Sequence, residues 1–190
     1  MSAGRLKVGA ALILTSPFLP MFFQGEEWGA STPFLYFCDH RDALLAEKVR
    51  EGRRREFSAL ADKPVKIPDP QAPETFRCSK LAWEELSLPR HAELFGWHKK
   101  LIRLRRSNPT LCDGRMEGLF AQGDENQRWL NVERGPWTIV CNLGHAPVSA
   151  RLRHGVHELI AASETGIVFS HPSIVLPPDS VAILKLPGGD

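Results

Sequence analysis

The pattern of hydrophobic and polar positions predicts a helix at the N-terminus of the chain. One face of this helix carries four apolar residues at helical spacing: Leu6, Ala10, Ile13 and Leu14. Arg5 and Lys7 are predicted to point away from that face. Ser2 is a candidate N-cap, and Pro17 stops the helix because the residue before a proline disfavours helical backbone. An amphipathic helix of this kind packs its apolar face against a core.

A continuous apolar run follows the helix at residues 20–24 (PMFFQ). A strand of a parallel sheet is buried on both faces, so its sequence is apolar at consecutive rather than alternating positions. Met21, Phe22 and Phe23 meet this requirement. A helix followed by such a strand is half of an α/β repeat. The first part of the chain is therefore predicted to have α/β architecture.

Residues 25–88 show little regular periodicity. Residues 42–55 are predicted to form a helix, and its basic run, Arg53 to Arg55, is predicted to face solvent. Residues 60–76 contain four prolines and predict an irregular surface loop. Loops of this length are usually functional lids or binding loops. Residues 79–83 predict a turn leading into a helix, in which Lys80 is either an ordinary turn residue or a ligand contact.

A second strong helix is predicted over residues 90–106, with Pro89 in its first turn. Its apolar stripe consists of Leu94, Trp97, Leu101 and Leu104. Five basic residues are predicted to face solvent: Lys99, Lys100, Arg103, Arg105 and Arg106. The last two complement the negative end of the helix dipole. Trp97 is a predicted core residue because it lies on the stripe, and Trp83 is assigned to the core as well.

After residue 113 the period changes to alternation. Short segments separated by Gly, Pro, Asn or Asp are predicted to be strands: residues 118–122, 128–134, 137–143, 148–153, 157–163, 167–170, 173–177 and 180–186. Many short strands with such turn signals are typical of an antiparallel β-sandwich. We therefore expect a domain boundary near residues 107–113, which gives one domain over residues 1–108 and a β-sandwich domain over residues 109–190.

Composition narrows the classes of partner and cofactor. Hydrophobic residues make up 43% and charged residues 24% of the chain, which is typical of a globular protein. The net charge of +2 is too small to favour nucleic acid or an anionic membrane surface, and the apolar run at residues 8–14 is too short to cross a bilayer. The seven histidines show no HExxH spacing, so no metal site is expected. No cofactor is expected either.

The four cysteines form no CxxC pair: Cys38, Cys78, Cys112 and Cys141. They are predicted to be reduced, buried thiols, which favours a reducing, cytoplasmic location.

The loop after the predicted strand supplies the candidate substrate-binding residues: Glu26, Glu27, Trp28, Phe37, Asp39 and His40. If residues 20–24 are a strand of an α/β barrel, this loop lies at the face where such barrels carry their active sites. A catalytic pair in a retaining glycosidase needs two carboxyls about 5–5.5 Å apart and aimed at one bond. Neighbouring residues of an extended segment point to opposite sides, so Glu26 and Glu27 are not predicted to be that pair. One glutamate is expected to bind loop backbone or an arginine.

The aromatic and polar candidates also have structural interpretations. Trp28, Tyr36 and Phe37 could stack on the apolar faces of sugar rings, or they could pack the loop down. Asp39 and His40 could orient a ligand hydroxyl, or Asp39 could be the N-cap of the next helix.

Several segments carry a family resemblance. They are residues 4–40 with the GEEWG turn, 51–59 (EGRRREFSA), 67–83 (IPDPQAPETFRCSKLAW), 101–109 (LIRLRRSNP), 128–144 (RWLNVERGPWTIVCNLG) and 176–186 (LPPDSVAILKL). The chain resembles the malto-oligosyltrehalose trehalohydrolase family of the α-amylase superfamily, and the resemblance extends over essentially all 190 residues. The sequence departs from the family pattern at Cys38, where a small polar residue is expected, and at Ala82, where an acidic one is expected.

The resemblance implies an α/β plus all-β fold: the C-terminal end of a (β/α)8 TIM barrel followed by an antiparallel β-sandwich. Members of the family hydrolyse the α-1,4 bond next to the trehalose end of maltooligosyl trehalose and release trehalose. Their aspartate nucleophile, glutamate acid/base and stabilising aspartate follow barrel strands 4, 5 and 7, which would lie upstream of this chain. No catalytic residue is therefore expected here, and the chain alone is expected to be an inactive, poorly soluble fragment.

The expected partners are maltooligosyl trehalose or a related α-glucan and the missing N-terminal part of the barrel. Two other interpretations stay open at this point. One is a fragment of a branching or debranching relative, and the other is a free-standing, non-catalytic carbohydrate-binding module.

Overall fold

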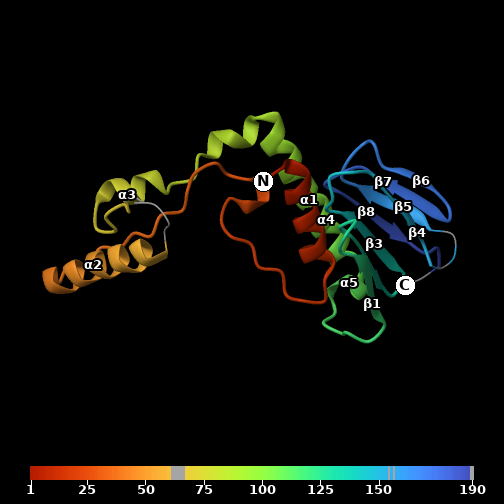
Figure 1. Cartoon of the computed structure of the whole chain (residues 1–190), viewed down its shortest axis with the longest axis horizontal. Coiled ribbons are helices and arrows are strands. Elements are labelled where there is room, and N and C mark those ends of the chain that lie inside the picture. The colour runs from red at the N-terminus through yellow and green to blue at the C-terminus, as the bar shows by residue number, and fades with distance from the viewer. Residues whose placement is uncertain (61–66, 154, 156, 189–190) are drawn as a thin grey trace. The chain divides into compact units, whose positions relative to one another are not determined.

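The computed structural model describes residues 1–60, 67–153, 155 and 157–188. The chain forms two compact units (Figure 1): Met1–Gly29 together with Leu86–Asp190, and Ala30–Glu85. This division differs from the boundary expected near residues 107–113, because helices that precede that point pack on the sheet that follows it. A domain boundary near residues 107–113 in a longer protein stays a prediction.

Helix α1 (Ala3–Thr15) forms where the pattern predicts it. Ser2 is its N-cap, and the Ser2 hydroxyl accepts a hydrogen bond from the backbone N–H of Arg5 at 3.1 Å. Its apolar buried residues are Val8, Ala10, Ala11 and Leu14. The helix is therefore amphipathic as expected, although its buried face is turned relative to the predicted one.

Lys7 contradicts the expectation that it points to solvent. Its residue surface is 4% exposed, and Nζ lies 2.6 Å from Glu93 Oε1, 2.9 Å from Glu164 Oε1 and 3.0 Å from the carbonyl of Ser163. Burial lowers the pKa of Lys7, but the hydrogen bonds and charges of the two glutamates outweigh burial and raise it. Carboxylates from distant segments, which the helical pattern cannot show, make this buried ammonium tolerable.

Residues 20–24 do not form the predicted strand. Their backbone has no strand assignment, and Met21 is 87% exposed. A strand of a parallel sheet needs neighbouring strands for its hydrogen bonds. Within the described ranges, every strand pairs antiparallel and none pairs with this segment.

Helix α4 (Pro89–Arg106) confirms the second strong helix, with Pro89 in its first turn. Leu94, Trp97 and Leu101 are buried as predicted, and the Trp97 indole donates to the carbonyl of Lys7 at 3.0 Å. A short helix, α5 (Pro109–Cys112), follows.

Arg105 is buried, which contradicts its predicted position on the solvent face. Its guanidinium donates to the carbonyls of Leu14 at 2.9 Å, Ser16 at 2.8 Å and Phe18 at 3.0 Å. The last carbonyls of a helix have no partner within the helix. Arg105 supplies partners at the C-terminal end of α1 and in the turn that follows, which explains why a charged side chain lies inside.

The antiparallel sandwich is confirmed, and each predicted strand segment overlaps an observed strand. The strands are β1 (Leu119–Asp124), β2 (Trp129–Arg134), β3 (Trp137–Asn142), β4 (Val148–Arg151), β5 (Glu158–Ala162), β6 (Val168–Ser170), β7 (Ser173–Leu176) and β8 (Ser180–Lys185). They form a five-stranded sheet in the order β1-β2-β3-β8-β5 and a three-stranded sheet in the order β4-β7-β6.

The five-stranded sheet lies between helices α1 and α4 on one face and the three-stranded sheet on the other (Figure 1), and apolar side chains fill both interfaces. On one face, Ile139, Cys141 and Ile183 pack against the side chains of α1 and α4. On the other face, Val140, Ala182 and Leu184 pack against the three-stranded sheet. Strands β3 and β8 are buried on both faces for this reason, and the unit has helix, sheet and sheet layers.

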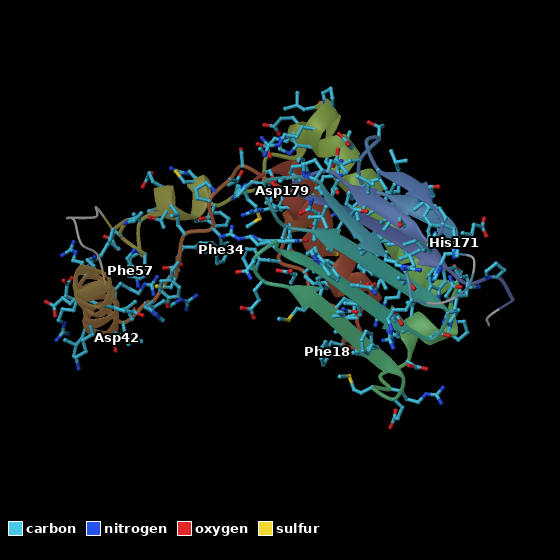
Figure 2. All side chains as sticks on the ribbon, turned by 45° about the vertical axis from the view of Figure 1, so that its right-hand side comes forward. Phe18, Phe34, Asp42, Phe57, His171 and Asp179 are labelled. Carbon is cyan, nitrogen blue, oxygen red and sulfur yellow. The ribbon has the colours of Figure 1, made fainter. Side chains whose placement is uncertain are left out.

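The Ala30–Glu85 unit contains helix α2 (Ala43–Leu60), near whose two ends Figure 2 labels Asp42 and Phe57, and helix α3 (Pro73–Cys78). Helix α2 confirms the predicted helix. Its N-cap is Asp42, whose Oδ1 accepts hydrogen bonds from the backbone N–H groups of Leu44 at 2.8 Å and Leu45 at 3.1 Å. The expected N-cap role of Asp39 is therefore wrong. Of the segment predicted to be irregular, residues 61–66 lie outside the described residues. Its last part is helical, because Pro73 occupies a first-turn position of α3.

The turn at residues 79–83 leads into a 3₁₀ helix, η2 (Trp83–Ser87), as predicted. Trp83 is 62% exposed, so its assignment to the core is wrong. All four cysteines are free. Cys141 is buried as predicted, whereas Cys78 and Cys112 are exposed, because each lies at the end of a short helix and outside the apolar layers. Across the described ranges, no helix combines the length and apolar character needed to cross a membrane.

Candidate functional site

The acidic turn is held by two glycines and a hydrogen bond. Gly25 and Gly29 have φ values of 83° and 66°, which favour glycine, and they flank the 3₁₀ helix η1 (Glu26–Trp28). Glu26 Oε2 accepts a hydrogen bond from the backbone N–H of Phe23 at 3.1 Å. One glutamate thus binds loop backbone, as expected. Glu27, half-buried beside it, has no hydrogen bond or ion pair with the described part of the chain.

Helix α4 packs against the end of this turn, at Trp28 and Gly29. Trp28 is 1% exposed, and its carbonyl lies 2.8 Å from Nδ1 of His91. A side chain at Gly29 would meet Leu94 at 3.1 Å. The indole therefore packs inside this unit, which is the structural one of its two interpretations.

The other candidates, Phe37, Asp39 and His40, belong to the Ala30–Glu85 unit. The backbone N–H of Cys38 donates to the carbonyl of Pro70 at 2.9 Å, and that of His40 donates to Oε1 of Gln71 at 3.1 Å. The loop carrying these residues is thus bonded to residues 70 and 71.

Phe37 lies in a small aromatic cluster of the same unit. Its ring is edge-on to the rings of Phe34 at 6.0 Å and Phe76 at 5.1 Å between centroids. Asp39 is exposed at the surface. The structure therefore brings Glu26, Glu27 and Trp28 together in one unit and Phe37, Asp39 and His40 together in the other. Their contact with a common substrate stays a prediction.

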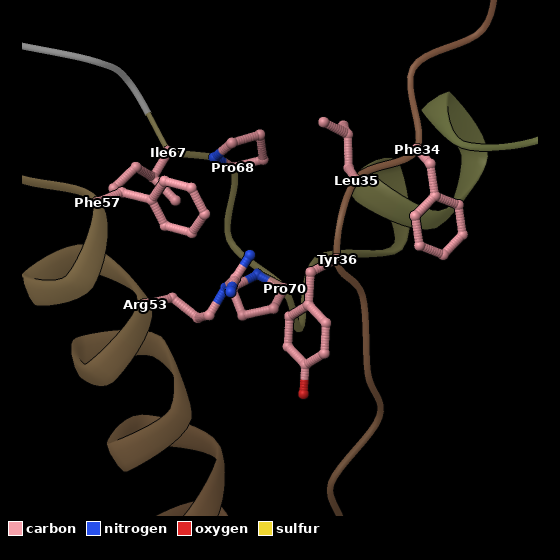
Figure 3. A pocket seen from close by; sticks show the side chains of 8 residues that line it. All are labelled: Phe34, Leu35, Tyr36, Arg53, Phe57, Ile67, Pro68 and Pro70. Atoms are coloured by element: carbon pink, nitrogen blue, oxygen red, sulfur yellow. The ribbon is translucent and has the colours of Figure 1, made fainter. Parts of the chain in front are cut away.

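The Ala30–Glu85 unit also contains a pocket that the sequence did not single out (Figure 3). Its volume is about 240 Å³, and its walls come from residues 34–36, from Arg53 and Phe57 of α2, and from Ile67, Pro68 and Pro70. The Arg53 guanidinium lies 4.7 Å from the ring centroid of Tyr36 and 4.5 Å from that of Phe57. This stacking corrects the expectation that Arg53 belongs to a solvated face. The four-residue spacing of Arg53 and Phe57 on a helix could have indicated it.

The charges around this pocket are paired. Arg50 binds Asp69 at 2.9 Å and also contacts Glu47, and Arg53 binds Glu56 at 3.2 Å. A hydrogen bond from the backbone of Gln71, together with Arg50, holds the pKa of Asp69 below its usual range. The pocket therefore combines apolar walls with locally balanced charge.

The acidic turn does not contain the facing pair of carboxyls that a retaining glycoside hydrolase uses. Glu26 and Glu27 are adjacent in the turn, and Glu26 is bonded to backbone, whereas a retaining pair faces one bond from two sides. In the part of the chain that the structure describes, no group of three or more His, Cys, Asp or Glu residues could hold a metal ion. The geometry supports binding rather than bond cleavage by these residues alone.

Known proteins resemble the chain along almost all of its length. A family model described as a domain of unknown function, DUF3459, matches residues 117–183 and so covers most of the sandwich. A malto-oligosyltrehalose trehalohydrolase from Brevibacterium helvolum is 42% identical over 188 residues, and one from Mycobacterium tuberculosis is 40% identical over 185 residues. Each match covers 97% of this chain and 31% of the relative. The chain thus spans about a third of the length of these relatives.

Solved structures agree with this relationship. A Salmonella typhimurium protein assigned as an alpha amylase has a TM-score of 0.77 and 31% identity, covering 97% of this chain and 31% of that protein. The alpha-amylase from H. orenii shares the fold, with a TM-score of 0.58 and 17% identity over 97% of this chain and 36% of that protein. Along almost all of its length, the chain is therefore homologous to one part of the proteins named malto-oligosyltrehalose trehalohydrolase, and it shares its fold with solved alpha-amylases.

Proposed function

We propose that this chain is the C-terminal part of a glycoside hydrolase that cleaves the α-1,4 bond next to the trehalose end of maltooligosyl trehalose and releases trehalose. The observation that carries the proposal is the identity of 40–42% over 97% of the chain to relatives named for this activity. The substrate would be maltooligosyl trehalose or a related α-glucan.

The catalytic carboxylates of such an enzyme would lie outside these 190 residues. The acidic turn offers two adjacent carboxyls, one of them bonded to backbone, rather than a pair facing one bond. The chain would instead contribute residues at the rim of the substrate site. Glu27 is the strongest of the predicted contacts, because it is partly accessible and has no hydrogen bond with the described residues.

Residues 20–24 would complete a (β/α)8 barrel in the longer protein. Their apolar side chains, with Met21 and Phe23 exposed, support this proposal because an apolar extended segment without partners is an aggregation hazard. The preceding part of the barrel would be the partner that pairs with this segment. We also propose a reducing, cytoplasmic setting, which the four free thiols support.

The test is a trehalose-release assay with maltooligosyl trehalose and the purified 190-residue chain. We expect no release above the buffer control, because the nucleophile and the acid/base are absent. Release that tracks the purified chain would overturn the view that the catalytic carboxylates lie elsewhere. A carbohydrate-binding module would also be inactive here. A second assay therefore measures trehalose release by a longer protein that contains the chain. Release is expected if the chain is part of the hydrolase, whereas a carbohydrate-binding module has no hydrolytic activity.

A further inference from the structure

The pocket of the Ala30–Glu85 unit has a shape that suits a small ligand (Figure 3). Phe57 and Ile67 lie on one side and Phe34 and Leu35 on the other, with Arg53 next to Pro70 and Tyr36. At about 240 Å³ it is smaller than the roughly 300–1,000 Å³ of pockets for drug-sized ligands. Prolines and aromatic rings lose little conformational freedom when a ligand binds, so such walls are preorganised.

The aromatic walls are open rather than part of a closed core. Tyr36 is 45% exposed, and Phe34 is exposed as well. A tyrosine whose role is only core packing would have its ring covered. The apolar surface here is therefore accessible to a ligand with an apolar face.

Arg53 supplies the polar component. A guanidinium has five N–H donors in a fixed plane, and its Nη1 bonds Glu56 Oε2 at 3.2 Å. Stacking against Tyr36 and Phe57 holds this plane in place. The remaining donors can bind hydroxyl groups at the edge of a ligand that lies on the apolar walls.

The balanced charge selects among possible ligands. An anion such as phosphate would need unpaired positive charge, yet Arg53 is paired with Glu56, and Arg50 is paired with Asp69 and Glu47. A purely apolar ligand would leave the donors of Arg53 facing it. The ligand should therefore be uncharged and should carry groups that accept hydrogen bonds from Arg53. A neutral sugar has both properties, because a pyranose ring has apolar C–H faces and a rim of hydroxyls.

We infer that this pocket is an α-glucan subsite, distinct from the acidic turn, that holds one glucosyl unit against Tyr36 and Phe57 with Arg53 donating to its hydroxyls. The choice of an α-linked glucan rests on the proposed function, whereas the neutral sugar class rests on the pocket itself.

The test measures binding of maltotriose and maltohexaose to the full 190-residue chain at submicromolar protein concentration, where self-association is small. Tyr36→Ala and Arg53→Gln are each expected to raise Kd at least tenfold. Arg53→Lys keeps the charge but loses the planar fork, and an increase of at least threefold is expected. Trp83→Ala, which removes an exposed aromatic of the same unit outside the pocket, is expected to leave Kd within twofold. Near-UV circular dichroism shows whether each variant remains folded.

Three results would overturn the inference. They are no maltooligosaccharide binding by the unaltered chain, unchanged Kd in both Tyr36→Ala and Arg53→Lys, or displacement of maltohexaose by equimolar inorganic phosphate. Different results test the subsite and the proposed hydrolase activity. If the pocket variants lose sugar binding but a longer protein containing the chain releases no trehalose, the subsite stands and the hydrolase proposal falls. If the longer protein releases trehalose and the pocket variants bind sugar normally, the hydrolase proposal stands and the subsite falls.

Discussion

Two buried cations give the interior of the helix layer its specificity at the scale of single residues. Lys7 joins α1 to α4 and to the segment after β5, through Glu93, Glu164 and the carbonyl of Ser163. Arg105 joins α4 to the end of α1 through three carbonyls. A buried charge is costly unless it is paired and hydrogen-bonded. These contacts therefore specify one arrangement of the two helices on the sheet.

Replacing Arg105 with methionine should destabilise the fold. Arg105→Met removes three charge-assisted hydrogen bonds and leaves carbonyls near the end of α1 without these partners. Hydrogen bonds of this kind contribute about 1.5–3 kcal/mol each and are not additive, so we expect the free energy of unfolding to fall by about 2–4 kcal/mol in urea denaturation. Arg106→Met, one residue away and exposed, is the matched control and should stay within about 0.5 kcal/mol. Equal stability of the two variants would refute this role.

Thiol reactivity should separate the cysteines by burial. Complete burial raises the pKa of Cys141 to about 12, and only the thiolate reacts with alkylating agents. At pH 8, iodoacetamide should therefore modify Cys78 and Cys112, which are exposed, and leave Cys141 intact. Peptide mass mapping reads out each site, and labelling in denaturant is the control in which all four react. Modification of native Cys141 at the rate of Cys78 would contradict its position between α1 and the sheet.

At the scale of elements, the sequence predicts what depends on local pattern. Eight strand segments and three helices lie where periodicity and turn residues place them. The predictions that are wrong concern side chains whose contact partners are distant in sequence. The carboxylates of Lys7, the carbonyls bound by Arg105 and the stacking of Arg53 on Tyr36 come from segments remote in sequence. The apolar run at residues 20–24 satisfies the strand pattern, but no described strand pairs with it.

For the candidate site, the sequence identified the acidic turn and the backbone contact of one glutamate. It did not identify the pocket, because Tyr36, Arg53 and Pro70 meet only when the segments around them fold together. It also left open whether Trp28 packs or stacks, which depends on how α4 covers the turn.

The connection between the start of α1 and the loop before β8 should depend on pH. The hydroxyl of Ser2 donates to Asp179 at 2.6 Å, and Arg5 binds the same carboxylate at 2.8 Å. These contacts hold the pKa of Asp179 below its usual range. The folded-state pKa lies below the unfolded value of about 3.9, so this stabilisation is complete well above pH 4 and is lost as pH falls through the folded pKa.

Asp179→Asn should therefore lower stability at pH 7 and reduce the loss of stability between pH 7 and pH 3. Asparagine suits the positive φ of 51° at this position, so the backbone is not strained. Thermal melts at both pH values provide the comparison, with Asp124→Asn at the end of β1 as a carboxylate control. An unchanged pH dependence in Asp179→Asn would show that this contact does not contribute.

Hydrogen exchange tests whether residues 20–24 are a strand that lacks its neighbours. In the isolated chain, the amides of Met21 and Phe22 should exchange at rates close to those of unstructured peptide. In a chimera in which this chain replaces the matching part of the Mycobacterium tuberculosis relative, we expect at least about 100-fold slower exchange because neighbouring strands would accept these hydrogen bonds. The amides of Val140 and Ile183, at the centre of the sheet, should be protected in both proteins. Equal exchange at Met21 in both would contradict the assignment.

At the scale of the whole molecule, the sandwich and the helix layer have cores of their own, while the acidic turn and the aromatic pocket lie in separate units. The chain spans about a third of the length of relatives named malto-oligosyltrehalose trehalohydrolase. Its described residues include the proposed sugar contacts, and the two carboxyls of its acidic turn are adjacent rather than facing. The chain is thus expected to serve the reaction only as part of a longer protein.

The most direct measurement of this claim is trehalose release from maltooligosyl trehalose by the same chimera, compared with the isolated chain at equal concentration. Folding of the chimera is verified by a cooperative melt. The account predicts release by the chimera at a rate within about tenfold of the relative's own, and none by the isolated chain. A folded chimera that releases no trehalose, or an isolated chain that does, would contradict it.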